Sequence, residues 1–216
     1  FAMGQAVPRT EDPRLLTGRG KYVDDMCLVA QTHAYVLRSP HAHARIVSID
    51  TREDEAMPGV LLVLTGKDWA EGNYGYLPPL MPRNRRDGTS LFNPPRPALA
   101  HGRVMVVGDP VAFVVAETVA QAKDAAEHIV VQYDPLPPLT DTARIGKPGA
   151  PQLWEGCPDN ETFFYTLGDK AAVEAAFAKA HHVTTVTSAI NRVTAATMEP
   201  RCCIGDYDPR DRSEGH

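Results

Sequence analysis

The chain has 216 residues, of which 43% are hydrophobic and 23% are charged, and these proportions are typical of a globular protein and exclude wholesale disorder. Its 16 glycines and 19 prolines neither dominate nor repeat, which excludes a fibrous protein, and no apolar run is long enough to cross a bilayer. The formal net charge of −5 gives no positive field that would attract nucleic acid or an anionic lipid surface.

The first part of the chain is a polar arm followed by strands. Residues 8–25 are rich in arginine, glycine and aspartate, which predicts an extended arm with turns. Residues 33–39 and 45–49 have strand-like patterns. Residues 59–65 form a continuous apolar run, which predicts a strand buried on both faces.

Two segments near these strands have other patterns. Residues 51–57 begin with threonine and have an acidic first turn, which predicts a short helix that Pro58 and Gly59 end. Residues 69–103 contain many prolines and little periodicity, which predicts a long loop. Loops of this length in a compact domain are usually functional or disordered, and its prolines, arginines and aromatic residues would suit packing against another protein surface.

The clearest unit spans residues 104–133. It begins with two predicted strands, 104–107 and 111–116, separated by a turn. Thr118 with Gln121 three residues later predicts the capping box of a helix, and a further strand follows at 130–133. The order of strand, helix and strand permits a parallel crossover without requiring one. The predicted apolar face of the helix comprises Val119, Ala122, Ala126 and Ile129.

The last third predicts a boundary and the start of a second domain. Residues 135–158 form a connector rich in proline and glycine, and Asp169 is then predicted to cap a helix with His181 in its last turn. Strands are predicted at 183–190 and 201–207, so this part has one helix and two strands and an unfinished sheet. The apolar face of the helix comprises Ala172, Val173, Ala176, Phe177 and Ala180.

The cysteines indicate a cellular compartment, and the two ends of the chain indicate a piece of a longer protein. The four cysteines are irregularly spaced, and Cys202 and Cys203 are adjacent and would point to opposite faces of a strand, so we expect reduced thiols in a cytoplasmic protein. No secretory signal opens the chain, which begins at Phe1 rather than methionine. Residues 213–216 resemble a cloning scar that leads into a histidine tag, so we expect a piece of a longer protein.

No complete catalytic constellation is present in the sequence. His41 and His43 would share one face of an extended segment, which suits either a metal site lacking its other ligands or a polar loop that precedes a strand. The Gly18-Arg19-Gly20 segment follows no strand and opens no helix, so it does not predict a phosphate site. We therefore predict no catalytic residue and no metal ligand from the residues alone.

Six segments, taken in order along nearly the whole chain, carry a family resemblance. They are residues 9–25 (RTEDPRLLTGRGKYVDD), 38–46 (RSPHAHARI), 57–60 (MPGV), 107–118 (VGDPVA and AET), 133–137 (YDPLP) and 198–201 (MEPR). In this order they resemble the molybdenum-binding large subunit of the xanthine dehydrogenase/aldehyde oxidase family, in the form of the aerobic carbon monoxide dehydrogenase large chain.

The resemblance implies an α+β fold. After an N-terminal arm at 1–17, it implies an α/β hammerhead domain at 18–141 and a connector at 142–167. The truncated start of a molybdopterin-binding domain would follow at 168–212, ahead of the tag scar at 213–216.

The resemblance also implies an activity for the whole protein. It would be an oxidoreductase that acts on CO, aldehydes or N-heterocycles at a molybdenum–pterin centre, with molybdopterin cytosine dinucleotide as the cofactor. Its partners would be a 2Fe–2S small subunit and an FAD-binding medium subunit, in a homodimer of heterotrimers. The family's catalytic glutamate and most pterin-binding loops would lie beyond residue 216, so the piece itself is expected to be inactive and to hold no cofactor.

One site residue is implied by position. Asn191 stands where CO-oxidising members have a glutamine close to molybdenum, and the shorter amide argues against CO as the substrate; the alternative is a turn residue at the end of a strand. Glu199 is expected to fix local backbone or a neighbouring arginine. The alternative to an enzyme piece is a stand-alone binding or assembly module without catalysis.

Overall fold

The computed structural model describes residues 3–157, 159–191, 193–197, 199, 201–210 and 213–215. The sequence motifs at Arg192, Met198 and Pro200, and the final residue of the predicted tag scar, lie outside the described residues. The chain divides into two compact units, one formed by Thr32–Lys179 and the other by Phe1–Gln31 with Ala180–His216.

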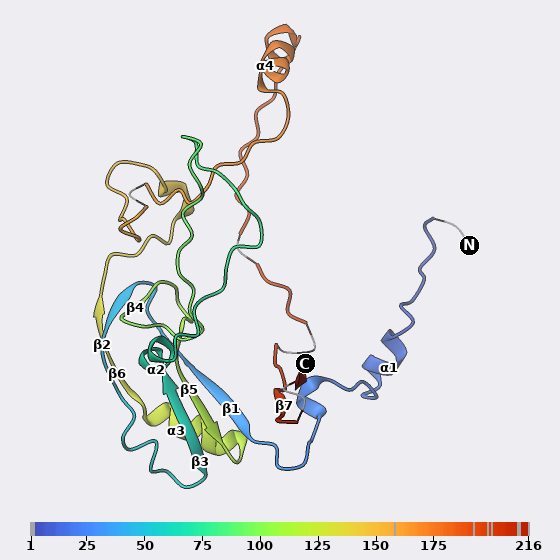
Figure 1. Cartoon of the computed structure of the whole chain (residues 1–216). Coiled ribbons are helices and arrows are strands. Elements are labelled where there is room, and N and C mark those ends of the chain that lie inside the picture. Colours follow the sequence, from blue (N-terminus) through green and yellow to red (C-terminus); the bar gives the residue numbers. More distant parts are fainter. Residues whose placement is uncertain are drawn as a thin grey trace. The chain divides into compact units, whose positions relative to one another are not determined.

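The larger unit is built on a three-stranded antiparallel sheet (Figure 1). Strand β5 (Pro110–Ala116) lies in the centre, between β1 (His33–Arg38) and β3 (Val60–Thr65). The sequence of β5 is almost entirely apolar, and its Val111 and Val114 are completely buried. These three strands match those predicted from the sequence to within one residue at each end.

The predicted burial of β3 on both faces is wrong. The strand lies at an edge of its sheet, and the side chains of Leu61 and Leu62 are 54% and 46% exposed. An apolar run sets the preference for a strand, whereas its place in the sheet depends on residues far away in the sequence.

A second antiparallel sheet has the order β4-β2-β6. It joins β4 (Arg103–Val104), β2 (Ala44–Asp50) and β6 (Val130–Pro135). The predicted strand at 104–107 is therefore shorter and begins one residue earlier. Because β5 and β6 belong to different sheets and each pairs antiparallel, the strand–helix–strand unit makes no parallel crossover in the described structure.

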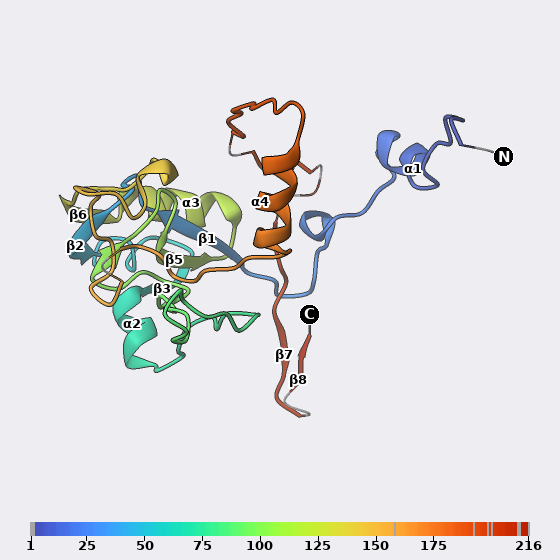
Figure 2. The same cartoon turned by 90° about the horizontal axis from the view of Figure 1, so that it is seen from above.

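Helix α3 (Val119–His128) packs against β1 and β5 and closes the core (Figures 1 and 2). Thr118 caps it as predicted, since its hydroxyl accepts a 3.2 Å hydrogen bond from the Gln121 N–H. Alanines on the buried face allow the helix to approach the sheet closely. The buried residues are Ala122, Ala125 and Ala126, followed by Ile129, whereas Val119 of the predicted face is 46% exposed.

One predicted helix is absent from the structure, and one helix occurs where the sequence analysis predicted a loop. Residues 51–57 form successive turns, with hydrogen bonds such as Glu55 N–H to Thr51 O, and no α-helix. The predicted loop at 69–103 instead begins within helix α2 (Gly66–Glu71). Its signal was present in the sequence, because Thr65 and Asp68 form a capping box.

Helix α4 (Lys170–Lys179) begins where predicted but buries none of its residues. The Asp169 carboxylate accepts a 3.0 Å hydrogen bond from the Ala172 N–H, which confirms the predicted cap. The helix ends before Ala180 and His181, and its apolar Val173 and Phe177 are 53% and 59% exposed.

The smaller unit contains little regular structure among its described residues. Its arm includes helix α1 (Asp12–Leu16) and a 3₁₀ turn, η1 (Val23–Asp25), where the sequence predicted only turns. The strand predicted at 183–190 is absent from these residues, and that at 201–207 is reduced to β7 (Asp206–Asp208), which pairs with β8 (Ser213–Gly215). A strand pattern without a pairing partner leaves backbone groups better satisfied by water.

The connector contains a second 3₁₀ turn, η2 (Thr142–Arg144), capped by Asp141. Among the helices in the described part of the chain, none combines the length and the apolar character that crossing a membrane requires.

Candidate ligand pocket

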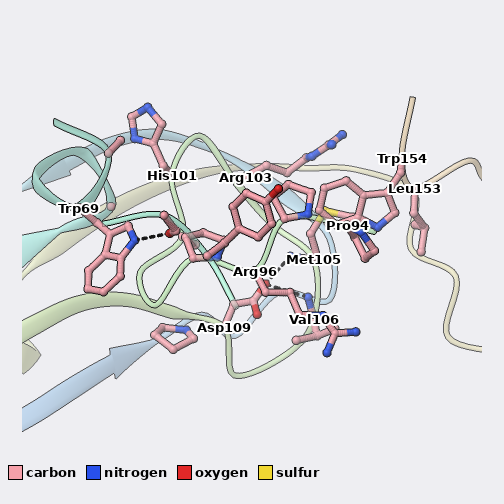
Figure 3. A pocket seen from close by; sticks show the side chains of 18 of the residues that line it. Trp69, Pro94, Arg96, His101, Arg103, Met105, Val106, Asp109, Leu153 and Trp154 are labelled. Atoms are coloured by element: carbon pink, nitrogen blue, oxygen red, sulfur yellow. Dashed lines mark hydrogen bonds between the residues drawn. The ribbon is translucent and has the colours of Figure 1, made fainter. Parts of the chain in front are cut away.

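A cavity of about 750 Å³ opens in the larger unit, between α2, β4 and the segment that contains Trp154 (Figure 3). Its lining comes from α2, from the 73–110 region and from residues 153–154. Trp69 and Trp154 stand at opposite ends of this lining in Figure 3. These are the two tryptophans of the chain.

Helix α2 holds Trp69 at one end of the pocket. The Asp68 carboxylate accepts hydrogen bonds of 2.7 Å from both the hydroxyl and the N–H of Thr65, and these bonds lower the pKa of Asp68 below its ordinary value. The Trp69 indole N–H donates to Gly75 O at 2.8 Å, which fixes the ring. At the start of the helix, a Cβ on Gly66 would lie 2.0 Å from Ala100 O, so this close backbone approach requires glycine.

A cluster of rings and a guanidinium forms the other end. The Arg103 guanidinium carbon lies 5.4 Å from the centroid of Trp154, within the range of a cation–π contact. The Phe92 ring packs on the same tryptophan at a centroid distance of 6.2 Å. Arg103 is half-buried, so its charge is only partly hydrated.

Asp109, the acidic residue in the lining of the pocket, is hydrogen-bonded to the backbone. One Asp109 carboxylate oxygen accepts hydrogen bonds from the N–H groups of Met105, at 2.5 Å, and Val106, at 3.1 Å (Figure 3). Among the described residues, no carboxylate forms an ion pair with Arg96 or Arg103. The pocket therefore combines apolar walls with two arginines that have no carboxylate ion-pair partner in the described part of the chain.

Ion pairs join residues 83–92 to residues 159–165. Arg85 donates to Asp159 at 2.9 Å, and Arg86 donates to Glu161 at 3.0 Å while lying 3.7 Å from the centroid of Phe164. These contacts bind the 83–92 region to the 159–165 region. Arg85 and Arg86 of the long loop thus make contacts within the larger unit.

The two histidines of the sequence motif have different surroundings. His43 is 6% exposed, and its Nδ1 lies 2.8 Å from Pro137 O, while its Nε2 has no hydrogen-bond partner. The His41 ring instead packs on Tyr133 at 4.8 Å. Within the described residues, no group of three or more histidine, cysteine or acidic side chains is arranged to hold a metal ion.

Asn191 and Glu199, the residues singled out near the end of the sequence, belong to the smaller unit. Asn191 is exposed in a stretch without regular structure. The Glu199 carboxylate accepts a 3.1 Å hydrogen bond from the backbone N–H of Val23, a residue of the distant N-terminal arm rather than of the local backbone.

Buried ionisable groups occur outside the pocket. Asp54 is 1% exposed and its Oδ1 has no partner, and burial raises the pKa of this carboxyl. Burial likewise raises the pKa of the Cys157 thiol. All four cysteines are described, and none forms a disulfide, in agreement with the expected thiols.

Comparison with known proteins identifies the family. Residues 17–137 match the family described as aldehyde oxidase and xanthine dehydrogenase, a/b hammerhead domain. The chain belongs to this family, and the fold class inferred from the sequence resemblance is confirmed.

Similar sequences are found among bacterial enzyme subunits. The chain is 39% identical to the nicotine 6-hydroxylase large subunit of Paenarthrobacter nicotinovorans, over 95% of this chain and 24% of the relative. It is 36% identical to the carbon monoxide dehydrogenase large chain of Afipia carboxidovorans, over 95% of this chain and 26% of the relative. The chain thus spans about a quarter of the length of these relatives.

Solved structures give a consistent result. A Cu,Mo-CO dehydrogenase in its carbon monoxide reduced state is 37% identical, with a TM-score of 0.61, and the match covers 83% of this chain and 23% of that one. Quinoline 2-oxidoreductase from Pseudomonas putida 86 is 42% identical, with a TM-score of 0.54, over 68% of this chain and 18% of that one.

Sequence reasoning did not find the pocket. Its lining residues are spread from Gly66 to Trp154, and neighbours in the pocket are distant in sequence. The one available signal was the composition of the long loop, which contributes prolines, aromatic rings and Arg96 to the lining.

Proposed function

We propose that this chain is part of the molybdenum-binding large subunit of a molybdenum hydroxylase, an oxidoreductase that acts on aldehydes, N-heterocycles or CO. The observation that carries the proposal is identity of 36–39% over 95% of the chain to two subunits that are named as a hydroxylase and a dehydrogenase. A relative from Escherichia coli O157:H7, 31% identical over 63% of the chain, is named as the molybdenum-binding subunit of xanthine dehydrogenase.

The proposed domain organisation follows the resemblance. Residues 18–141 form the hammerhead domain after an arm at 1–17, and residues 168–212 begin a molybdopterin-binding domain after a connector at 142–167. The exposed apolar side of α4 supports this division, because Val173 and Phe177 would be covered by the remainder of that second domain.

The described residues do not by themselves form a cradle for a molybdenum–pterin group. Asn191 is exposed, and it does not line the cavity beside α2. We therefore derive no catalytic step from this chain. We propose that Asn191 lies near molybdenum in the whole protein, where its short side chain disfavours CO relative to an aldehyde or an N-heterocycle.

The proposal extends to cofactor and partners. The cofactor would be molybdopterin cytosine dinucleotide, and the partners a 2Fe–2S subunit and an FAD-binding subunit, in a cytoplasmic homodimer of heterotrimers. Two relatives support the assembly by name, one as a large subunit and one as subunit gamma of the 6-hydroxypseudooxynicotine dehydrogenase complex.

An activity comparison tests this proposal. The polypeptide that contains these residues would be purified with its natural partners and supplied with an aldehyde, an N-heterocycle or CO and an artificial electron acceptor. We expect molybdenum-dependent turnover of at least one substrate, and none by the 216-residue chain alone. Failure of every substrate in a preparation that does contain molybdenum would contradict the proposed activity and favour a binding or assembly module.

A further inference from the structure

The pocket beside α2 and β4 has flat apolar walls. Both tryptophans of the chain line it, together with Tyr76 and prolines from the 94–97 segment. The Trp69 indole N–H is already satisfied by Gly75 O, so the contribution of Trp69 to a ligand is the surface of its ring. Walls of this kind favour a planar aromatic group, which stacks on rings and buries apolar area.

The positively charged side chains of the pocket favour a planar ligand that carries a negative charge. Arg96 and Arg103 both line the pocket, and among the described residues neither forms an ion pair with a carboxylate. The Asp109 carboxylate also lines the pocket, but it already accepts hydrogen bonds from two backbone N–H groups. A half-buried guanidinium without a carboxylate partner favours an anion.

Arg103 has the donor geometry that a carboxylate requires. Its guanidinium carbon lies 5.4 Å from the centroid of Trp154, and a planar fork of N–H groups matches the two oxygens of a carboxylate. A cavity of about 750 Å³ is also within the usual range for small-molecule sites.

We propose that this pocket binds a small planar aromatic carboxylate, with the ring on the aromatic walls and the carboxylate on Arg103. This inference goes beyond the proposed molybdenum chemistry and concerns residues that the 216-residue chain itself contains. The ligand-binding proposal can therefore be wrong while the proposed molybdenum hydroxylase function is right, and the proposed function can be wrong while the pocket binds the ligand.

Calorimetric titration of the 216-residue chain provides the first test. We expect 2-naphthoate to bind roughly tenfold more tightly than its neutral isostere 2-naphthamide, and acetate to bind weakly. In the same samples, both indole N–H signals in a ¹⁵N–¹H spectrum are expected to shift with naphthoate, because both tryptophans line the pocket. Equal affinity for naphthoate and naphthamide, or shifts confined to signals outside the pocket, would overturn the proposal.

A pair of arginine variants provides the second test. Arg103→Met is expected to weaken naphthoate roughly tenfold and to leave naphthamide nearly unchanged. Arg45→Met is the matched control, because this exposed arginine faces Arg103 but does not line the pocket, and we expect a change of no more than about twofold. An equal loss in both variants would indicate general attraction of anions and contradict the site. If Arg103→Met fails to fold, the comparison of naphthoate with naphthamide on the unaltered chain decides the question.

Discussion

Helices α3 and α4 have the same length and similar alanine-rich compositions but different surroundings. Each has ten residues, is rich in alanine and begins after a side chain that caps the first turn. Helix α3 buries three alanines against a sheet, whereas α4 buries nothing. Local sequence therefore determines where each helix begins, and the surface that it meets determines what the helix contributes to stability.

The largest expected effect comes from a charge placed at equivalent positions of the two helices. Ala125 and Ala176 each stand seven residues after the cap, but Ala125 is fully buried and Ala176 is exposed. We expect Ala125→Glu to lower the free energy of unfolding by about 3 kcal/mol or more, because a carboxylate would be buried without a partner. Ala176→Glu should change it by no more than about 0.5 kcal/mol. Urea unfolding followed by circular dichroism measures both, and equal losses would show that α4 is buried after all.

Removing each cap should give a smaller contrast. Thr118→Ala loses the hydrogen bond to the Gln121 N–H, and we expect a loss of about 1 kcal/mol in the free energy of unfolding. Asp169→Ala should leave the main unfolding transition unchanged and increase amide exchange in α4 alone, because no buried contact couples that helix to the core. A shift of the main transition by Asp169→Ala would mean that α4 folds cooperatively with the sheet.

The smallest expected effect concerns Asp54, and it depends on pH. Because burial raises its pKa in the folded state, the folded protein favours the protonated form, so the cost of the charge is present at neutral pH and disappears as the pH falls below the ordinary value of 3.8. We expect Asp54→Asn to raise the free energy of unfolding by about 0.5–1 kcal/mol at neutral pH, with the gain shrinking in acid.

Asp50 is the control for this prediction, with the opposite sign. Its hydrogen bonds to Arg52 lower the pKa of the carboxyl to about 2, so Asp50→Asn should slightly reduce stability at neutral pH, and the difference should vanish as the pH falls toward that value. Chemical unfolding over a range of pH measures both variants. A gain in stability from Asp54→Asn that does not change with pH would contradict the explanation based on a buried charge.

The elements that sequence predicted correctly are those determined by neighbouring residues. The apolar run of β5 and the caps Thr118 and Asp169 are local signals, and the structure has all three. The family was also recognisable from ordered segments of sequence, and the comparisons confirm it.

The errors concern properties that depend on distant residues. The edge position of β3 follows from its pairing with β5 alone, and residues 183–190 have a strand pattern but no strand in the structure. The ligand pocket brings together side chains from Trp69 to Trp154, so no single window of the sequence contains its pattern. The position proposed for Asn191 beside molybdenum remains a prediction.

The most direct test of the central proposal is the molybdenum content of the polypeptide that carries these residues, purified intact with its natural partners and measured by elemental mass spectrometry against protein concentration. We predict stoichiometric molybdenum together with a bound pterin. A correctly folded preparation of that polypeptide without molybdenum or pterin would contradict the assignment to a molybdenum hydroxylase.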